Sequence, residues 1–441
     1  MKKNRLISAL QYVDPALIEE AMEGHRKESH FRLGTLIAAC LCLVCSITAL
    51  WYMANVKTGP ATDEPAVIVP TEETYETGAA DTYSDMRIAF ITDGLFLGVY
   101  SHIYETVVQF CEDNPGARLI YYSLQDTSTE GYIATTKQAV AEGYDVILFF
   151  QEDDEHDDMI ARTVMETADM YPDVYYLVVG VGEESMSEDY VLPSNVCCIT
   201  FQEEIVGFMA GVAAVRLGYT KLGFLGTKSI PRIVRYGYGF LQGAEYAAAL
   251  TDTAVEVKYA YANREYSDEG LTDAMSEWYA EGTEVVFACG GSVNQSIMDA
   301  ADQAGAKYIE LEDFMWLDKL YEEGVMLTAV VEQIPEAIYT YLTNICTGNW
   351  GNGTNKFIRL GITSATNPED NYIGFSEFAQ FAEGFTYEDY IDLLEDLING
   401  NILVSSETDD MPTIPHLTVD DRGELFLEQE PETEPEPTGG K

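Results

Sequence analysis

The chain has 441 residues, and its 75 Asp and Glu against 24 Lys and Arg give a formal net charge of −51. Hydrophobic residues make up 47% of it, enough to bury the cores of two or three domains. Such an acidic chain argues against nucleic acid as a partner and against docking on anionic lipid through its folded part, because both need clustered Lys and Arg.

An uncharged apolar segment follows a basic stretch near the N-terminus. Residues 33–56 hold no Asp, Glu, Lys or Arg and are long enough to cross the roughly 30 Å hydrocarbon core as a helix. The basic stretch "HRKESHFR" precedes them, so the positive-inside rule predicts residues 1–32 in the cytoplasm and the main domain outside the cell membrane. The alternative is a lipoprotein, because "IAAC" resembles a lipoprotein cleavage box that ends at Cys40. Residues 1–32 are either a docking segment for a cytoplasmic partner or a solubilising, orienting tail.

Two acidic stretches frame the outer part of the chain. Residues 57–84 are rich in Pro, Thr, Gly and acid without periodicity, which predicts an extended linker. From about Ser405 the chain is again acidic and Pro-rich, and it ends "EQEPETEPEPTGGK". We therefore predict that residues 405–441 are a disordered tail and that residues 85–404 form the folded domain.

Within residues 85–404, short apolar runs alternate with helical stretches. Examples of the runs are "RIAFIT" at 87–92, "DVILFF" at 145–150 and "KLGFLG" at 221–226. Continuous apolar strands indicate sheets that are covered on both faces, and hence parallel α/β units. Nine or ten such strands exceed one comfortable open sheet. We predict two lobes, with a ligand between them at the carboxyl ends of the strands.

The sequence carries no recognisable catalytic motif. A GxGxxG after a strand, a GxxxxGK[ST] phosphate loop and a GxSxG elbow are all absent, and the acids are too numerous for a glycosidase pair to stand out. Neither the eight Cys nor the five His show the spacing of a metal site. We predict a protein that is not an enzyme and has no metal and no cofactor.

Loops at the predicted strand ends carry the candidate binding residues. Asp93 ends the first strand, "CGGS" at 289–292 ends another, and Glu312 lies at a third. A carboxylate accepts hydrogen bonds from vicinal hydroxyls of a sugar, and the ring of Tyr100 or Tyr266 suits a flat apolar group such as a base.

Residues 86–404 resemble the basic membrane protein (BMP) family of extracytoplasmic substrate-binding proteins, the purine nucleoside receptor or PnrA-like group. The matching phrases include "AVAEGYDVILFF", "YPDVYYLVVG", "IPRIVRYGYGFLQGAEYA" and "GVMLTAVV", in that order. The resemblance implies a type I periplasmic-binding-protein fold with two Rossmann-like lobes, a three-segment hinge and closure around a ligand.

The resemblance also implies a set of ligand-binding residues. They are Asp93, Tyr100, Ser101, Tyr266, Gly290, Gly291, Glu312 and Glu332. Tyr266 falls where the family stacks an aromatic ring on a base, and Glu312 falls where the family has its ribose-binding Asp. Glu332 replaces a family Lys, a charge reversal that makes a more cationic ligand an option.

A basic cluster lies at 226–240, "GTKSIPRIVRYGYGF". Arg232 and Arg235 are three residues apart near the start of a predicted helix, where positive charge opposes the helix dipole. We predict that Arg235 pairs with an acid as a fold or hinge residue; the alternative is a ligand contact.

These observations predict a membrane-anchored solute-binding protein that binds a nucleoside or similar small molecule for an ABC importer. Its partners would be that ligand and a transporter permease. The alternative is a ligand-sensing receptor that signals to its cytoplasmic segment, because a cytoplasmic tail on an uncleaved anchor is unusual for an importer subunit.

Overall fold

The computed structural model describes residues 85–92, 99–151, 157–187, 189–264, 266–290, 293–312, 324–352, 355–376 and 379–426. All of them belong to one compact unit, Ala66–Lys441. The predicted cytoplasmic segment 1–32, transmembrane helix 33–56 and linker 57–84 lie outside the described residues. Within the described ranges, no helix combines the length and hydrophobicity needed to cross a membrane.

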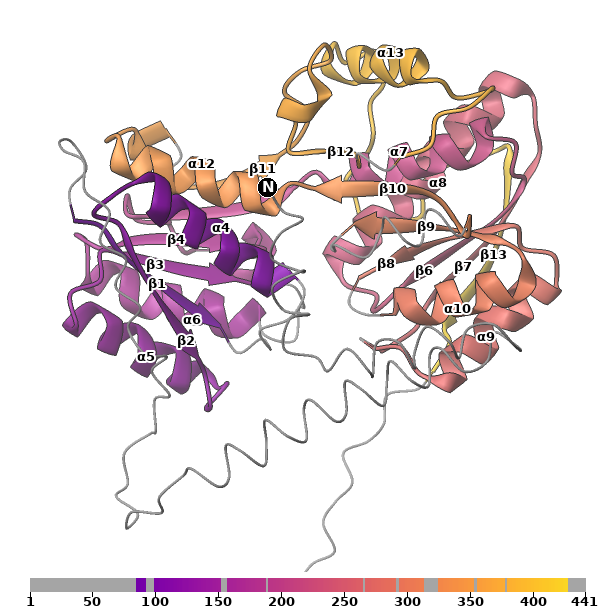
Figure 1. Ribbon diagram of the computed structural model, residues 1–441. Helices are drawn as coiled ribbons and strands as arrows, with labels where there is room; N and C mark the ends of the chain where they lie inside the picture. The colour runs from indigo at the N-terminus through magenta and orange to yellow at the C-terminus, as the bar shows by residue number, and fades with distance from the viewer. Residues whose placement is uncertain are drawn as a thin grey trace, which may run out of the picture. The chain divides into compact units, whose positions relative to one another are not determined.

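Two sheets form the frame of the fold (Figure 1). In spatial order, the first consists of β11 (Lys356–Leu360), β5 (Val196–Phe201), β4 (Tyr175–Val179), β3 (Val146–Phe150), β1 (Arg87–Thr92) and β2 (Arg118–Ser123). The second consists of β12 (Ile373–Phe375), β10 (Met326–Glu332), β9 (Lys307–Glu312), β8 (Val285–Cys289), β6 (Lys221–Gly226), β7 (Val255–Tyr261) and β13 (Leu417–Glu424). Neighbouring strands are parallel throughout, apart from the antiparallel pair β10 and β12.

Helices cover both faces of each sheet. The first sheet carries α4 (Val99–Asp113) and α12 (Ile334–Cys346) on one face and α5 (Thr129–Ala141) and α6 (Asp157–Thr167) on the other. The second carries α7 (Glu203–Arg216) and α8 (Pro231–Thr251) on one face and α9 (Glu269–Ala280) and α10 (Asn294–Ala304) on the other. Helix α13 (Tyr387–Ile398) lies beyond β12 in the chain. We call each sheet with its helices a lobe.

The strands are apolar on both faces because each face meets a separate hydrophobic core. In β1, Ile88 and Phe90 belong to one core, whereas Ala89 and Ile91 belong to the other. All four side chains are fully buried. A run without alternating polar residues is therefore what a central parallel strand requires, and the predicted α/β class is confirmed.

Among the described residues, the chain passes between the two sheets three times. It leaves β5 for α7 at Gln202, leaves β10 for α12 at Gln333, and leaves β11 for β12 across residues 361–372. This connectivity gives the two-lobed arrangement with three crossing segments that the family resemblance implies.

Helices α7 and α8 pack with their backbones in contact at glycines. A Cβ on Gly207 would lie 2.0 Å from the carbonyl oxygen of Tyr236, and one on Gly243 would lie 2.0 Å from that of Phe208. Any larger residue would push the two helices apart. Helix α7, which follows the first crossing at Gln202, is therefore packed tightly against α8, the helix that carries Arg232 and Arg235.

The prediction that residues 405–441 form a disordered tail is wrong for its first part. Residues 417–424 form β13, which pairs in parallel with β7 from Leu417 beside Val255 to Glu424 beside Tyr261. Acid and proline dominate the composition of this stretch, but Leu417 and Val419 alternate with polar residues and pack on the core of the second lobe. The folded domain therefore extends to at least Phe426, and residues 427–441 lie outside the described part.

Candidate functional site

The carboxyl edges of both sheets carry the predicted binding residues. In open parallel sheets this edge binds ligands, because the loops that follow successive strands meet there. Tyr100, in the first turn of α4, packs its ring edge-to-face on Phe150, the last residue of β3, with 5.2 Å between ring centroids. Ser101 follows it in the same turn. Both residues thus lie at the carboxyl edge of the first sheet.

Gly290 brings two loops of the second sheet together. It follows β8 with φ of 93°, in the left-handed region that favours glycine, and a Cβ there would lie 2.7 Å from Oγ1 of Thr227. Thr227 itself follows β6 and is buried. Only glycine fits between these loops, so the packing of the two loops by itself accounts for a glycine at position 290.

The other predicted residues either belong to the strands and loops of the second lobe or lie outside the described residues. Tyr266 lies between β7 and α9 and is 60% exposed, while Glu312 and Glu332 are the last residues of β9 and β10. Asp93, Gly291 and the side chain of Glu312 lie outside the described residues. The described backbone thus places Tyr100 and Ser101 on one lobe and Tyr266, Gly290, Glu312 and Glu332 on the other.

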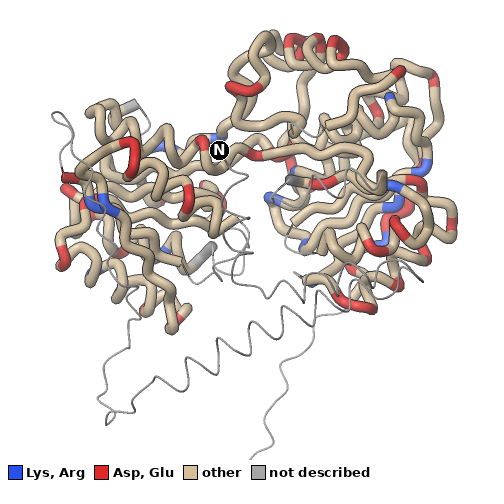
Figure 2. The backbone as a smooth tube through the Cα atoms, in the orientation of Figure 1, with Lys and Arg blue, Asp and Glu red and all other residues tan. Residues whose placement is uncertain are grey.

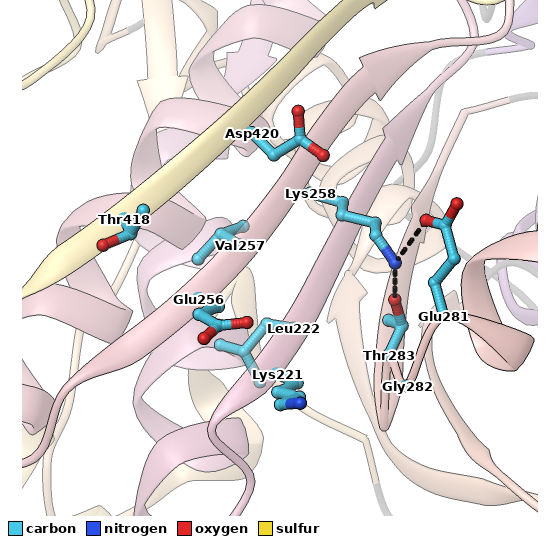
Figure 3. Close-up of a pocket in the computed structure, with 10 residues that line it drawn as sticks. All are labelled: Lys221, Leu222, Glu256, Val257, Lys258, Glu281, Gly282, Thr283, Thr418 and Asp420. Atoms are coloured by element: carbon cyan, nitrogen blue, oxygen red, sulfur yellow. Dashed lines mark hydrogen bonds and ion pairs between the residues drawn. The ribbon is translucent and has the colours of Figure 1, made fainter.

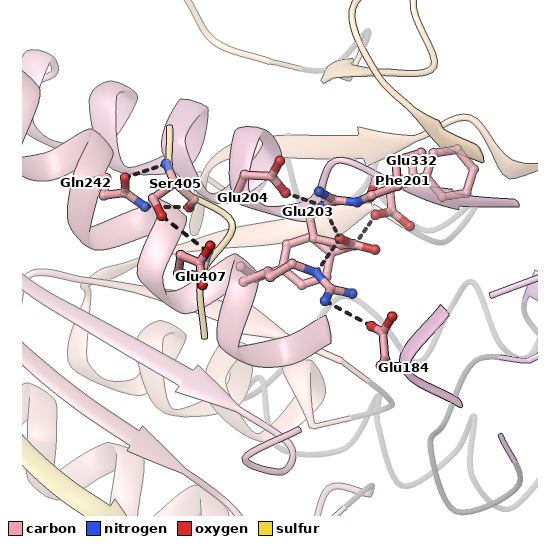
Figure 4. Close-up of polar contacts among 11 residues, drawn as sticks. Glu184, Phe201, Glu203, Glu204, Gln242, Glu332, Ser405 and Glu407 are labelled. Carbon is pink, nitrogen blue, oxygen red and sulfur yellow. Dashed lines mark hydrogen bonds and ion pairs between the residues drawn. The ribbon is translucent and has the colours of Figure 1, made fainter. Parts of the chain in front are cut away.

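Three arginines and four glutamates form an ionic network at the crossings, and Figure 4 labels the four glutamates. Arg359 in β11 lies 3.0 Å from Glu203 and 2.5 Å from Glu204, measured from Nη2 to Oε2 in each case. Arg235 Nε lies 2.8 Å from the same oxygen of Glu203, and its Nη1 lies 3.0 Å from Glu184 Oε1. The prediction that Arg235 pairs with an acid is confirmed.

Glu332 has its own partners in this network. Arg232 Nη2 lies 3.1 Å from Glu332 Oε2, and the Tyr236 hydroxyl donates a hydrogen bond to Oε1. The reversed charge at this position is therefore neutralised by a cation of the same chain. Glu332 on its own no longer argues for a cationic ligand.

The network joins all three crossings. Glu203 begins α7 directly after the first crossing, Glu332 ends β10 directly before the second, and Arg359 is the next-to-last residue of β11, before the third. Arg232 and Arg235 stand in the first turns of α8, where the acids offset their unfavourable interaction with the helix dipole. Arg235 also reaches Glu184, between β4 and β5 of the first lobe, so this ion pair links the lobes.

Burial shapes the ionisation of these acids. The side chains of Glu203, Glu204 and Glu332 are 1%, 6% and 4% exposed. Burial raises the pKa of Glu204 in spite of Arg359, and it raises the pKa of Glu332 in spite of Arg232. Burial also acts to raise the pKa of Glu184, but a hydrogen bond from its own backbone N–H and the charge of Arg235 outweigh it, so that this pKa is lowered.

A cavity of about 190 Å³ lies beside the network at the carboxyl edge. It is lined by Gly180, Gly182, Glu184, Ser185, Thr200, Glu203, Ile230, Pro231, Arg232 and Arg235. Pockets for small molecules usually measure about 300–1,000 Å³, so this cavity can form one end of a site but not the whole of one.

A second cavity lies at the opposite edge of the second sheet (Figure 3). Its lining includes residues from the amino-terminal halves of β6, β7 and β13, and Lys258 points toward Glu281 and Thr283. Lys258 Nζ lies 3.0 Å from Glu281 Oε2 and donates to Thr283 Oγ1 at 2.9 Å. Because its lysine already has these partners and the cavity is at the amino edge, the carboxyl edge remains the candidate site.

Acidic residues are spread over the helices and loops of both lobes, whereas basic residues are few (Figure 2). Among the described residues, no group of three or more His, Cys, Asp or Glu could hold a metal ion. The described residues at the carboxyl edges are aromatic rings, backbone loops and paired charges.

Two covered parallel sheets joined by three crossings form the periplasmic-binding-protein-like fold that ABC solute-binding proteins share. The solved structure of an ABC transporter solute-binding protein from Conexibacter woesei has this fold, with a TM-score of 0.55 and 17% identity over 73% of this chain and 99% of that one. The family model described as ABC transporter substrate-binding protein PnrA-like (Bmp) matches residues 86–407. The chain belongs to this family, as the resemblance in its sequence predicted.

Two curated relatives show how far the similarity reaches. Basic membrane protein B of Borrelia garinii subsp. bavariensis is 25% identical over 230 residues, which are 51% of this chain and 61% of that protein. The ABC transporter nucleoside-binding protein BmpA of Lactococcus lactis subsp. cremoris is 31% identical over 126 residues, 28% of this chain and 34% of that protein. The chain matches less than two thirds of the length of each of these relatives.

Proposed function

We propose that the protein is an extracytoplasmic solute-binding protein, anchored in the membrane by residues 33–56, that binds a nucleoside or a similar small molecule for an ABC importer. The observation that supports this function is the family match over residues 86–407, which covers both lobes apart from β13 and includes all the predicted binding residues. The Lactococcus lactis relative, which is described as nucleoside-binding, supports the choice of ligand.

The chemistry of the described residues favours a ligand that has a flat ring and no negative charge. Tyr266 leaves 60% of its surface exposed, and stacking on a base is worth about 1–3 kcal/mol. The arginines that line the cavity, Arg232 and Arg235, are both engaged by glutamates. An anionic group such as a phosphate would have to replace these glutamates at the arginines, whereas a neutral nucleoside would not. A nucleoside therefore fits this edge better than a nucleotide does.

A thermal-shift assay on the full chain in detergent would test the function. We expect the melting temperature to rise with one or more members of a nucleoside panel, because a ligand at 100 times its Kd stabilises the folded state by about 2.7 kcal/mol. Tyr266→Ala should remove most of that shift, whereas Tyr387→Ala, at another exposed tyrosine, should keep it. A panel of nucleosides, bases and sugars that produces no shift would contradict the proposal.

The anchored form and the importer role need separate tests, since residues 1–56 lie outside the described part. An antibody against residues 1–20 should detect the mature membrane protein if the anchor is uncleaved, whereas cleavage before Cys40 would remove this epitope. Deleting residues 5–24 should leave uptake intact in an importer subunit. Intact binding with a lost intracellular response would instead support the receptor that signals through its cytoplasmic segment.

A further inference from the structure

The chain continues folded beyond the segment that matches the family. The match ends at residue 407, but residues 405–426, which we call the C-terminal strap, are held along the second lobe. Ser405 and Gln242 of α8 exchange two hydrogen bonds, of 2.8 and 3.0 Å, which Figure 4 shows. Further on, the His416 backbone N–H donates to Glu245 of α8 at 2.8 Å. The strap is thus fastened to α8 before β13 begins.

The direction of β13 decides where the strap ends. A strand parallel to β7 runs from the amino edge of the sheet to the carboxyl edge, and β13 keeps its pairing with β7 up to Glu424 beside Tyr261. The next residue continues it, since the Leu425 N–H donates to the Tyr261 carbonyl at 2.8 Å. The strap therefore delivers Leu425 and Phe426 to the edge at which we place the ligand.

At that edge, Phe426 contacts the loop that carries Tyr266. Asn263 Nδ2 donates to the Phe426 carbonyl at 3.1 Å, and the guanidinium of Arg264 lies 3.7 Å from the centroid of the Phe426 ring. Arg264 is also paired with Asp268. Asp268 is the N-cap of α9, and its Oδ1 accepts a hydrogen bond from the Leu271 N–H at 2.8 Å. The residues on both sides of Tyr266 are thus linked to the strap.

We propose that the C-terminal strap positions Tyr266 for the ligand. In this proposal the Phe426 ring packs against the Arg264 guanidinium and so keeps Arg264 paired with Asp268. The inference rests on the proposed function, because it takes Tyr266 as a ligand contact. A loop that is ordered before binding loses less conformational entropy when the ligand arrives, so the strap increases affinity without touching the ligand. Phe426 is then a positioning residue.

A simpler role for β13 would be to cover the edge of the sheet. Asp420, Asp421 and Arg422 are charged residues of the kind that discourage pairing with another chain. Edge protection alone predicts that loss of the Phe426 ring leaves the β7–α9 loop unchanged, because β13 would still pair with β7.

Hydrogen exchange and binding, measured on the full chain in detergent, distinguish these roles. In Phe426→Ala we expect amide exchange in residues 262–272 to be about tenfold faster than in the wild type, with exchange in α4 unchanged, since local opening is governed by local contacts. We expect the Kd for the nucleoside that gives the largest thermal shift to rise about fivefold at an unchanged melting temperature of the free protein. Phe426→Tyr keeps an aromatic ring and should match the wild type in both measurements.

Unchanged exchange in residues 262–272 of Phe426→Ala would overturn the inference and leave β13 with edge protection. Faster exchange with an unchanged Kd would overturn the positioning role while leaving nucleoside binding intact. A wild type that binds no nucleoside would contradict the proposed function, and it would also contradict the inference that the strap positions Tyr266 for a ligand. In that case faster exchange in the variant would still support the contact between strap and loop.

Discussion

Replacing Arg359 with leucine would test whether the ionic network stabilises the fold. Arg235 still neutralises Glu203 in this variant, so the loss of charge compensation falls on Glu204, for which the described contacts show Arg359 as the cation. Removing one partner of a buried ion pair costs about 3–5 kcal/mol. Since the Arg359 side chain is 34% exposed, water can reach the vacated position, and we expect a loss of about 2–3 kcal/mol at pH 8.

The loss should depend on pH with a defined sign. Burial already raises the pKa of Glu204 above its ordinary value of 4.5, and removing Arg359 takes away the charge that opposes this rise. The folded variant then binds a proton more readily than the unfolded chain does, so its stability increases as the pH falls from 8 through the raised pKa. Urea unfolding followed by tryptophan fluorescence should show a smaller difference from the wild type at pH 5 than at pH 8.

Two matched variants make this test specific. Arg359→Leu combined with Glu204→Gln should recover most of the stability at pH 8, because no buried charge is then left without a partner. Arg118→Leu, at an exposed arginine of β2, should change stability by less than about 0.5 kcal/mol. A loss of the same size at both pH values, or no gain from Glu204→Gln, would refute the reasoning.

Three further predictions concern backbone contacts and a capped helix. Gly243→Ala should destabilise the protein by about 3 kcal/mol in urea unfolding, because its Cβ would meet the Phe208 carbonyl; Gly351→Ala, with nothing within 4 Å, is the control. Gly290→Ala should cost about 1–2 kcal/mol, because alanine is strained at φ of 93° and meets Thr227, and it should also weaken ligand binding in the thermal-shift assay. Thr386→Val should raise the pKa of Asp389 from about 2 part of the way toward its ordinary 3.8 when titrated by NMR, because the variant loses the Thr386 hydroxyl that donates to this carboxylate but keeps the backbone N–H of residue 386 and Arg216. The stability that Asp389 contributes is present above pH 3.8 and is lost as the pH falls toward 2, so the wild type should lose more stability than Thr386→Val in that window.

The central strands could be predicted from sequence because burial on both faces leaves a continuous apolar run. The runs predicted at 87–92 and 221–226 coincide with β1 and β6, and the run at 145–150 contains β3. The edge strand β11, "KFIRL", was not predicted, because Lys356 and Arg359 interrupt its apolar run. Strand β13 was missed for a similar reason, since its alternation is embedded in an acidic, Pro-rich stretch.

The candidate site could be located from sequence, but its ionic partners could not. Counting strand ends placed Tyr100, Tyr266 and Gly290 at the carboxyl edges, because this depends only on the order of strands and loops. The pairs of Arg232 with Glu332 and of Arg359 with Glu204 join residues 100 and 155 positions apart. Two arginines at a helix start indicated that acids must lie nearby, but 75 acidic residues gave no means of choosing among them.

The parallel direction of β13 has a practical consequence for measuring ligands. Because the strap ends beside the Tyr266 loop, a fluorescent dye attached at an engineered cysteine in place of Leu425 would stand next to the proposed binding edge. Leu425 packs on the outside of a core of the second lobe and is partly exposed, so a dye attached there can reach the solvent. An environment-sensitive dye at this position would turn the protein into an optical reporter of solute concentration.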